Sequence, residues 1–302
     1  MLPQSGFTND TPLGGDRGKI IVTGSNGQLG HELKEIASVF PQFQFIFLYR
    51  ADASLSNPSS LQNIFKQFQP HFLINCAAYT AVDKAEKEID ESLEANATAV
   101  GILAGLCKIN NCRFIHISTD YVFDGNGNSP LRESDSVDPV NYYGATKLAG
   151  EQLAMQKNAD TIIIRTSWVY SFHGKNFVKT MLRLMNEKQS IGVVNDQWGS
   201  PTYAADLADA IMKIVVSKKW LPGIYHFSNE GEISWFDFAV EIKNRIQSSC
   251  IVNPISTEQF PTPAKRPKYS VMDKTKIQET FSVQLKDWKA SLQTCLNKIM
   301  AT

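Results

Sequence analysis

Short apolar runs recur along the first half of the chain and are separated by segments of helical length and character. The runs are Ile20–Val22, Phe43–Leu48, Phe72–Asn75, Phe114–Ser118 and Ile162–Thr166. The first run is continuously apolar and the others are mainly apolar, which is typical of parallel strands that are buried on both faces. The alternation of strands with helices predicts an α/β fold with a Rossmann-type, doubly wound parallel sheet and helices on both faces.

The remaining pattern predicts further elements with less regular spacing. Residues Asp83–Ile109 are rich in Ala, Glu, Lys and Leu, which predicts one long helix over the sheet. After Trp168, glycine and proline become frequent, and we expect a strand at Ile224–Ser228 and a helix at Trp235–Gln247. The proline-rich stretch Phe260–Pro267 predicts an ordered loop, because proline removes backbone donors and fixes φ.

Composition narrows the class of protein. The 302 residues carry 30 Lys plus Arg and 30 Asp plus Glu, so no bulk positive charge would attract nucleic acid or an anionic membrane surface. No apolar run approaches the ~20 residues that cross a bilayer, and residues 1–18 lack the order of a signal peptide. The five cysteines lack metal-ligand or dithiol spacing, so we expect reduced thiols and a cytoplasmic protein.

A glycine-rich segment follows the first predicted strand directly. It reads TGSNGQLG, with glycines at positions 24, 27 and 30. Glycines at this spacing let a backbone turn tightly and approach a pyrophosphate, whose charge is stabilised at the start of a helix. A plain tight turn is the alternative interpretation, and the strand before the motif favours dinucleotide binding. We therefore expect contacts from Gly24, Asn26, Gly27, Gln28, Leu29 and Gly30.

The end of the second strand bears on the choice of cofactor. Arg50 would suit the 2′-phosphate of NADP, whereas Asp52 would suit the free ribose hydroxyls of NAD. Arg50 and Asp52 therefore favour different cofactors. We expect NADPH, with NADH as the alternative.

A tyrosine and a lysine four residues apart form the second chemical signal. Tyr143 and Lys147 would lie on one face of a helix. A phenol is a weak acid at neutral pH, and a neighbouring ammonium and a cationic nicotinamide are expected to lower its pKa. Ser118 and Thr119 end the fourth strand, where ligands bind in open α/β sheets, and either hydroxyl would polarise a carbonyl. Together these residues predict a proton donor beside a cofactor site.

These segments give the chain a resemblance to the extended short-chain dehydrogenase/reductases and, within them, to the dTDP-4-dehydrorhamnose reductases. The segments that carry it span residues 23–270, which is most of the chain. They read TGSNGQLGHEL, NCAAYTAVDKAE, STDYVFDG, YYGATKLAGE, RTSWVY, NFVKTML, VVNDQWGSPT and PTPAKRPKYS. The resemblance implies reduction of the C4 ketone of dTDP-4-dehydro-L-rhamnose by NADPH or NADH, for the biosynthesis of cell-surface polysaccharide.

The resemblance also implies roles for matched positions. Tyr143 would protonate the oxygen, Lys147 would hold the nicotinamide ribose, and Thr119 would bind the ketone. Asp120 and Trp168 match positions associated with the sugar. Ala77, Ala78, Tyr79 and Ile117 would flank the cofactor, and the nearest matches for ribose contacts are Arg50, Ser54 and Leu55.

Some features depart from the family or rest on charge alone. Some members bind Mg²⁺ through glutamates at a dimer interface, but only Glu32 matches here, and the tail reads Asn297-Lys298-Ile299 where a carboxylate would be needed. We therefore expect no metal site, although a homodimer remains expected. The basic pair Lys265 and Arg266 would suit a nucleotide diphosphate.

Three alternatives remain open. A nucleotide-sugar 4-epimerase or 4,6-dehydratase would use the same tyrosine and lysine with a retained NAD, but a dehydratase commonly has Asp-Glu after the threonine, where this chain has Asp120-Tyr121. Another nucleotide-sugar reductase is the second alternative, and a regulatory NADP-binding subunit without catalysis is the third. The predicted organisation is a flexible tail over 1–18, a dinucleotide-binding domain over 19–168 to whose sheet later segments return, and mainly a smaller α/β substrate-binding lobe over 169–302.

Overall fold

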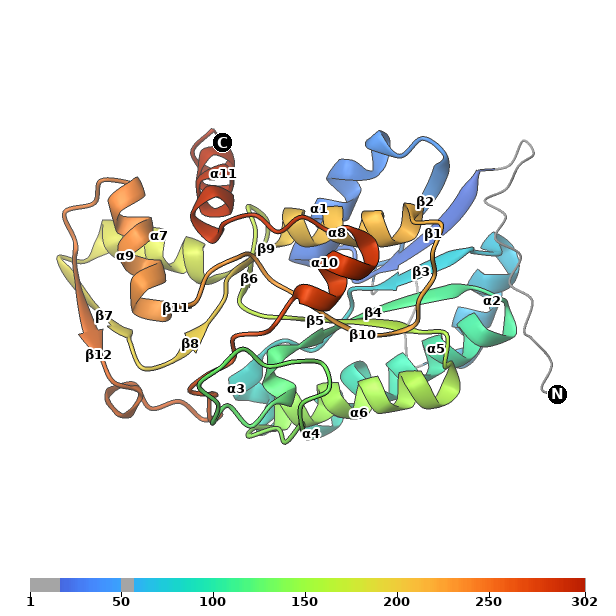
Figure 1. Cartoon of the computed structure of the whole chain (residues 1–302), viewed down its shortest axis with the longest axis horizontal. Coiled ribbons are helices and arrows are strands. Elements are labelled where there is room, and N and C mark those ends of the chain that lie inside the picture. The colour runs from blue at the N-terminus through green and yellow to red at the C-terminus, as the bar shows by residue number, and fades with distance from the viewer. Residues whose placement is uncertain (1–16, 50–56, 302) are drawn as a thin grey trace.

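The computed structural model describes residues 17–49 and 57–301 and contains a six-stranded parallel sheet. Its spatial order is β2–β1–β3–β4–β5–β10 (Figure 1). The strands are β1 (Gly18–Thr23), β2 (Phe43–Phe47), β3 (Phe72–Asn75), β4 (Arg113–Thr119), β5 (Ile162–Thr166) and β10 (Gly223–Phe227). Each coincides with a predicted apolar run to within a residue or two. The predicted Rossmann-type sheet is therefore confirmed.

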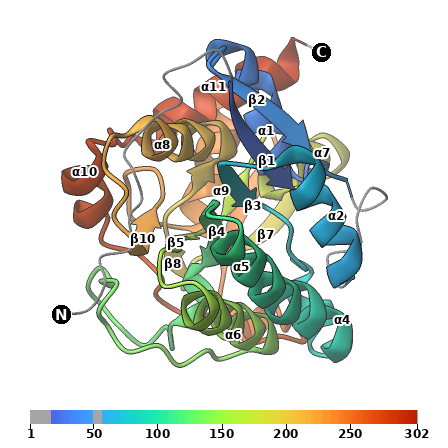
Figure 2. The ribbon, with the colours of Figure 1, turned by 90° about the vertical axis from the view of Figure 1, so that its right-hand side faces the viewer.

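Helices cover both faces of this sheet, as Figure 2 shows end-on. Successive residues of β1 alternate between two apolar cores, so that Ile20 and Val22 pack on one face and Ile21 on the other. The first face is covered by α1 (Gln28–Ile36), α8 (Ala204–Val216) and α10 (Thr275–Phe281), and the second by α2 (Pro58–Phe68), α5 (Ala99–Ile109) and α6 (Tyr142–Lys157). Burial on both faces explains why the central strands are mainly apolar.

The strand order reverses between β1 and β3. From β1 the chain pairs first with β2 on one side and then returns to place β3 on the other side. In open α/β sheets this reversal opens a crevice at the carboxyl ends of the two strands, and ligands bind there. The glycine-rich segment follows β1 and therefore lies at this point.

A smaller lobe with its own apolar core stands beyond the carboxyl ends of the strands, at the left of Figure 1. Its elements are β6 (Val169–Tyr170), α7 (Phe177–Glu187), β7 (Ser190–Val194), β8 (Trp198–Gly199), β9 (Thr202–Tyr203), β11 (Ile233–Ser234), α9 (Trp235–Arg245), β12 (Ile251–Ile255) and α11 (Trp288–Met300). The predicted helix at Trp235–Gln247 is confirmed to within two residues. The division of the chain into a nucleotide domain and a substrate lobe stays a prediction.

The prediction of one helix over Asp83–Ile109 is wrong. The chain forms α3 (Val82–Ala85), leaves the helix at residues 86–88, and is then helical without a break from Ile89 to Ile109 through α4 (Ile89–Leu93), a π-helical turn (Glu94–Thr98) and α5. Tertiary contacts override helix propensity here. The Tyr79 hydroxyl donates to Glu88 Oε2 at 2.5 Å, and Gly150 of α6 brings its backbone against the carbonyl of Asn96 in the π-helical turn.

The connections contain short 3₁₀ turns at Ala37–Val39, Asp120–Val122 and Thr257–Gln259. Residues 260–267 form neither helix nor strand, which confirms the predicted loop. None of the helices in residues 17–49 and 57–301 combines the length and apolar character needed to cross a lipid bilayer. All five cysteines lie in the described residues and are free thiols.

Candidate active site

The glycine-rich loop makes a close backbone approach at the point where the strand order reverses. Gly24 has φ +67°, and a Cβ there would lie 2.5 Å from the backbone nitrogen of Ala77. A Cβ at Gly30 would lie 2.6 Å from the carbonyl oxygen of Gly24. Gly27 is the N-cap of α1 and has no side chain that could accept from the first N–H groups of this helix. These N–H groups therefore remain available on the side of the loop. The loop is thus a cradle that side chains would fill, which fits a pyrophosphate.

The loop after β3 lies against this cradle. Asn96, in the π-helical turn, accepts from the backbone N–H of Tyr79 at 2.8 Å and donates to the Tyr79 carbonyl at 3.0 Å. This pair of bonds fixes the course of Ala77–Tyr79, and no motif in the sequence indicated Asn96. The predicted ribose contacts Arg50, Ser54 and Leu55 lie outside the described residues, as does Asp52.

Gln28 joins the start of α1 to the smaller lobe. Its side-chain oxygen accepts from Asn176 Nδ2 at 2.9 Å, and its side-chain nitrogen donates to the carbonyl of Val169 at 3.4 Å. Asn176 also caps α7 by accepting from the N–H of Lys179. The segment predicted to hold the pyrophosphate is therefore linked to both halves of the molecule.

The end of β4 brings Thr119 beside Tyr143. Asn141 caps α6 by accepting from the N–H of Gly144 at 2.8 Å, and Gly144 lies against the backbone carbonyl of Tyr121. The Tyr121 and Tyr143 rings meet edge to face with centroids 5.8 Å apart. Because glycine allows this contact, the first turn of α6 packs directly on the residues that follow β4. The two predicted catalytic hydroxyls are thereby brought together.

Burial raises the pKa of Tyr143 to about 12, although the Thr119 hydroxyl lowers it in part. The prediction that the lysine would lower this pKa is wrong for the chain itself. Lys147 turns its Nζ to the carbonyl of Ile117 at 2.6 Å and to His116 Nε2 at 3.4 Å. A phenol with a raised pKa stays protonated at neutral pH, which suits a proton donor.

Lys147 is buried, with 1% of its surface exposed. Burial lowers the pKa of its ammonium to about 8, against opposing contributions from Glu151 and Cys76. The lysine therefore lies close to its titration point at physiological pH, unlike an exposed lysine.

Asp120 is buried between Thr119 and the segment that follows the proline-rich loop. Its Oδ1 accepts from the Thr119 hydroxyl at 3.0 Å, and its Oδ2 has no hydrogen-bond partner. Burial raises its pKa to about 7, although hydrogen bonds from Ser270 and Thr119 lower it in part. The folded chain therefore binds this proton more tightly than the unfolded chain, in which the pKa is near 3.8. The contribution of this proton to the free energy of unfolding is complete below about pH 4 and is lost as the pH rises to about 7.

The variant Asp120→Asn tests this linkage. Between pH 4 and pH 8 its free energy of unfolding should rise relative to the wild type by at least about 1 kcal/mol, since one pKa unit corresponds to about 1.4 kcal/mol. Urea unfolding of both proteins across this range measures the difference. Parallel curves for the two proteins would contradict the raised pKa.

Trp168 directly precedes β6, the first strand of the smaller lobe, and has a left-handed backbone conformation with φ +48°. Its indole stacks on that of Trp235, with ring centroids 3.5 Å apart. Gly199 lies beneath it, where a Cβ would come within 2.7 Å of the indole. A flat aromatic surface held in this way suits one face of a sugar or base. The sequence indicated Trp168 but neither of its supports.

The basic pair in the proline-rich loop is divided between two environments. Arg266 donates to both carboxylate oxygens of Asp83, at 2.6 and 2.8 Å, and so ties this loop to α3. Lys265 is exposed, and its carbonyl accepts from Asn141 Nδ2 at 2.8 Å. The Arg266 guanidinium thus already has an anionic partner in Asp83, and the diphosphate contact of Lys265 and Arg266 stays a prediction.

Comparisons with known proteins place this geometry in a family. The model of the RmlD substrate binding domain matches residues 18–301. The dTDP-4-dehydrorhamnose reductase of Aggregatibacter actinomycetemcomitans is 38% identical over 285 residues, which cover 91% of this chain and 97% of the relative. The chain belongs to the dTDP-4-dehydrorhamnose reductase family.

Solved structures of this family share the fold. The crystal structure of a dTDP-4-dehydrorhamnose reductase from Clostridium acetobutylicum has a TM-score of 0.90 at 39% identity and covers 93% of this chain and 99% of its own. The enzyme from Bacillus anthracis, solved in complex with NADP, has a TM-score of 0.90 at 38% identity and covers 94% of this chain and 100% of its own. The recognised resemblance is confirmed, and the chain is an oxidoreductase by family.

Glu32, the position that matched a metal ligand of the family, is buried in this chain. It accepts from the Ser171 hydroxyl at 2.6 Å, and the Lys298 ammonium lies 3.7 Å from its other oxygen. Lys298 also donates to Glu35 at 2.7 Å. Among the side chains that the structure describes, no group of three or more His, Cys, Asp or Glu residues is arranged to hold a metal ion.

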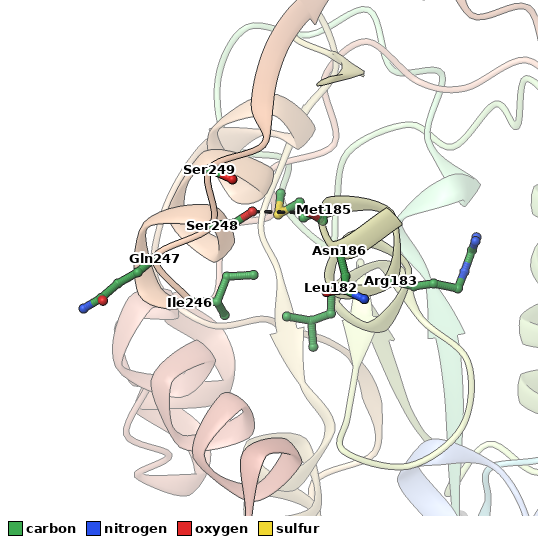
Figure 3. Close-up of a pocket in the computed structure, with 8 residues that line it drawn as sticks. All are labelled: Leu182, Arg183, Met185, Asn186, Ile246, Gln247, Ser248 and Ser249. Atoms are coloured by element: carbon green, nitrogen blue, oxygen red, sulfur yellow. Dashed lines mark hydrogen bonds between the residues drawn. The ribbon is translucent and has the colours of Figure 1, made fainter. Parts of the chain in front are cut away.

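A surface hollow of about 650 Å³ lies in the smaller lobe, between the carboxyl ends of α7 and α9 (Figure 3). It contains none of the residues that the family resemblance assigns to substrate or cofactor. Its one charged side chain, Arg183, already pairs with Glu187 at 2.7 Å. The lining is Leu182, Arg183, Met185, Asn186, Ile246, Gln247, Ser248 and Ser249. The hollow is therefore separate from the candidate active site.

Proposed function

We propose that this chain uses NADPH to reduce the C4 ketone of dTDP-4-dehydro-L-rhamnose to dTDP-L-rhamnose. The observation that carries the proposal is the grouping of Thr119, Tyr143 and Lys147 beside the glycine-rich cradle at the carboxyl ends of the strands. Relatives that are 37–39% identical over more than 90% of the chain are named for this reaction, and the Bacillus anthracis relative is solved with NADP.

The side chains divide the work of the reaction. NADPH, when bound, supplies the hydride that the protein itself lacks. When the ketone binds, the Thr119 hydroxyl turns its one hydrogen from Asp120 Oδ1 to the ketone oxygen and polarises it. Tyr143 then donates the proton that turns this oxygen into a hydroxyl. Lys147 holds the ribose next to the nicotinamide. Since burial keeps Tyr143 protonated, the proton is in place before the negative charge develops.

The proposed cofactor site joins the cradle to the ends of β3 and β4. It comprises Gly24, Asn26, Gly27, Gln28, Leu29, Gly30, Ala77, Ala78, Tyr79, Ile117, Tyr143 and Lys147, with Arg50, Ser54 and Leu55 as further candidates. The proposed sugar site comprises Thr119, Asp120, Tyr143 and Trp168. The stacked indole of Trp168 and the position of β6 beside Gln28 support a sugar between the sheet and the smaller lobe.

Gly24→Ala tests the cradle. The added Cβ would meet the backbone of Ala77 and would strain a residue at φ +67°. We expect NADPH to bind at least about tenfold more weakly, which corresponds to about 1.4 kcal/mol. Isothermal titration with NADPH measures the change, and circular dichroism confirms the fold. Unchanged affinity in a folded variant would place the pyrophosphate elsewhere.

Two alternatives differ in outcome from this proposal. An epimerase would convert its nucleotide sugar without net oxidation of added NADPH, and a regulatory subunit would bind NADPH without turnover. The intact Thr119, Tyr143 and Lys147 group favours catalysis, because a binding subunit has no need of a proton donor. The names of the relatives favour reduction over epimerisation.

A coupled assay tests the function. The substrate dTDP-4-dehydro-L-rhamnose is generated in place, NADPH or NADH is added, and oxidation of the cofactor is followed together with the mass of the sugar product. We expect dTDP-L-rhamnose and one oxidised cofactor per product, with faster turnover for NADPH. NADPH binding without product would contradict the proposal.

The cellular setting of the enzyme is also a proposal. Five free thiols support a reducing, cytoplasmic compartment. A homodimer stays a prediction, and light scattering at micromolar concentration would measure the mass in solution.

A further inference from the structure

A row of buried polar side chains runs behind Lys147 across three neighbouring strands. Thr23 ends β1, Asn75 ends β3, and His116 lies within β4. Thr23 is in register with Asn75, and Asn75 with His116, so the three side chains lie on one face of the sheet. Each is at most 1% exposed. The proposed reaction gives none of these three residues a role.

The hydrogen bonds of this row determine the orientation of the Asn75 amide. The backbone N–H of Ala77 donates to Asn75 Oδ1 at 3.3 Å, and the Thr23 hydroxyl donates to the same oxygen at 2.6 Å. Because a backbone N–H only donates, this atom of Asn75 must be the oxygen. The amide nitrogen therefore faces His116 Nδ1, at 3.0 Å.

The donors and acceptors around His116 also determine its tautomer. Burial and the nearby Lys147 lower the pKa of this histidine well below its usual value, so the ring is neutral and carries one N–H. Since the Asn75 amide donates to Nδ1, this nitrogen accepts, and the hydrogen is on Nε2. The assignment follows from the partners on each side of the ring.

His116 Nε2 faces the Nζ of Lys147 at 3.4 Å. A charged ammonium has donors only, so it would oppose the Nε2–H group, whereas a neutral amine has a lone pair that accepts this hydrogen. In both forms Lys147 can donate to the Ile117 carbonyl at 2.6 Å. When Lys147 is charged, the His116 Nε2–H group and the ammonium are two donors that face each other without an acceptor. When Lys147 is neutral, its nitrogen accepts the Nε2–H hydrogen bond.

We propose that His116, held in its Nε2–H form by Asn75, is a positioning residue that favours the free-base form of Lys147. The inference rests on the proposed function, in which Lys147 holds the cofactor ribose. Glu151, one turn along α6, also faces Lys147 and favours its charged form, against burial. Cys76, after β3, faces it too, but burial raises the pKa of this thiol, so it carries no charge near pH 8. His116 is thus the polar neighbour that opposes the charge, and it brings the lysine nearer to neutrality.

The consequence is a pH limit on cofactor binding. An ammonium holds ribose hydroxyls more firmly than an amine does, so NADPH affinity should fall as the pH rises through the pKa of Lys147, which is about 8. In His116→Phe the ring remains but the opposing N–H is lost. The midpoint of this fall should then move to higher pH by about one unit.

The binding experiment compares this variant with a matched control. NADPH affinity is measured by fluorescence titration from pH 6.5 to 9.5 for the wild type, His116→Phe and His226→Phe. His226 is also fully buried, on β10, and its Nδ1 bonds the Asp273 carbonyl. We expect a raised midpoint in His116→Phe alone. An unchanged midpoint in folded His116→Phe, or an equal rise in His226→Phe, would overturn the proposal.

A spectroscopic experiment reads the tautomer without substrate or turnover. Nitrogen-15 spectra of histidine-labelled protein, with the His116 signals identified by their loss in His116→Phe, should show the proton on Nε2. In Asn75→Asp the carboxylate accepts, so the proton should move to Nδ1. A wild-type ring protonated on Nδ1, or an unchanged tautomer in Asn75→Asp, would overturn the proposal. Because neither readout requires catalysis, failure here is distinguishable from failure of the proposed reaction.

Discussion

Replacing Tyr143 by phenylalanine is expected to lower kcat by about 10²–10⁴-fold, the usual contribution of general acid catalysis. The phenol is buried beside Thr119 and stays protonated at neutral pH because burial raises its pKa to about 12. Phenylalanine keeps the ring that packs edge to face on Tyr121, so the fold and the affinity for NADPH should not change. Steady-state kinetics with titration of NADPH binding measures both quantities.

The neighbouring tyrosine supplies the control. Tyr142→Phe removes a phenol one residue away, and the backbone N–H of Tyr142, which bonds Glu86 at 2.8 Å, is unaffected. We expect kcat close to that of the wild type. If Tyr143→Phe turned over normally, or if Tyr142→Phe lost as much activity, the proton donor would be wrongly assigned.

Breaking the buried ion pair between Glu151 of α6 and Arg165 of β5 should have the largest effect on the free energy of unfolding. Glu151 accepts from Arg165 Nε at 2.9 Å and from Nη2 at 2.7 Å, and both side chains are at most 3% exposed. Glu151→Met leaves the guanidinium charged and buried against the ring of Phe123, which lies 5.0 Å away. We expect a loss of about 3–5 kcal/mol in the free energy of unfolding, measured by urea denaturation.

A double variant separates the unpaired charge from the loss of packing. In Glu151→Met with Arg165→Met both charges are gone and the volume is nearly kept, so most of the lost stability should return. A double variant as unstable as the single one would show that the ion pair contributes beyond compensating for a buried charge. A loss below about 1 kcal/mol in the single variant would contradict the burial of the pair.

The location of the sheet strands was predictable because most of their residues are buried between the two layers of helices. Their spatial order was not predicted. Residues 20–22 and 162–164 are continuously apolar for this reason, and they lie in β1 and β5. Local chemistry was also predictable: Gly24 lies at the tight turn and close backbone approach that the motif implied, and Tyr143 and Lys147 share a helix. These features depend on residues close together in the sequence.

Features that depend on contacts between distant segments were not predictable. The predicted helix over 83–109 breaks at residues 86–88, and it contains a π-helical turn where Asn96 bonds the loop after β3 and Gly150 packs on the Asn96 carbonyl. Neither partner of Asn96 is near it in sequence. The raised pKa of Tyr143 follows from burial that only the folded chain creates. His116 is one polar residue in an apolar strand, and its contact with Lys147 exists only across the packed sheet and helix.

Transfer of deuterium tests the central claim most directly. The enzyme is supplied with dTDP-4-dehydro-L-rhamnose and NADPH that carries deuterium at the reactive C4 position of the nicotinamide, and the sugar product is examined by mass spectrometry and NMR. We predict one deuterium at C4 of the sugar, together with a hydroxyl whose proton exchanges with water. A reduced sugar without deuterium at C4, or with deuterium at another carbon, would contradict the account.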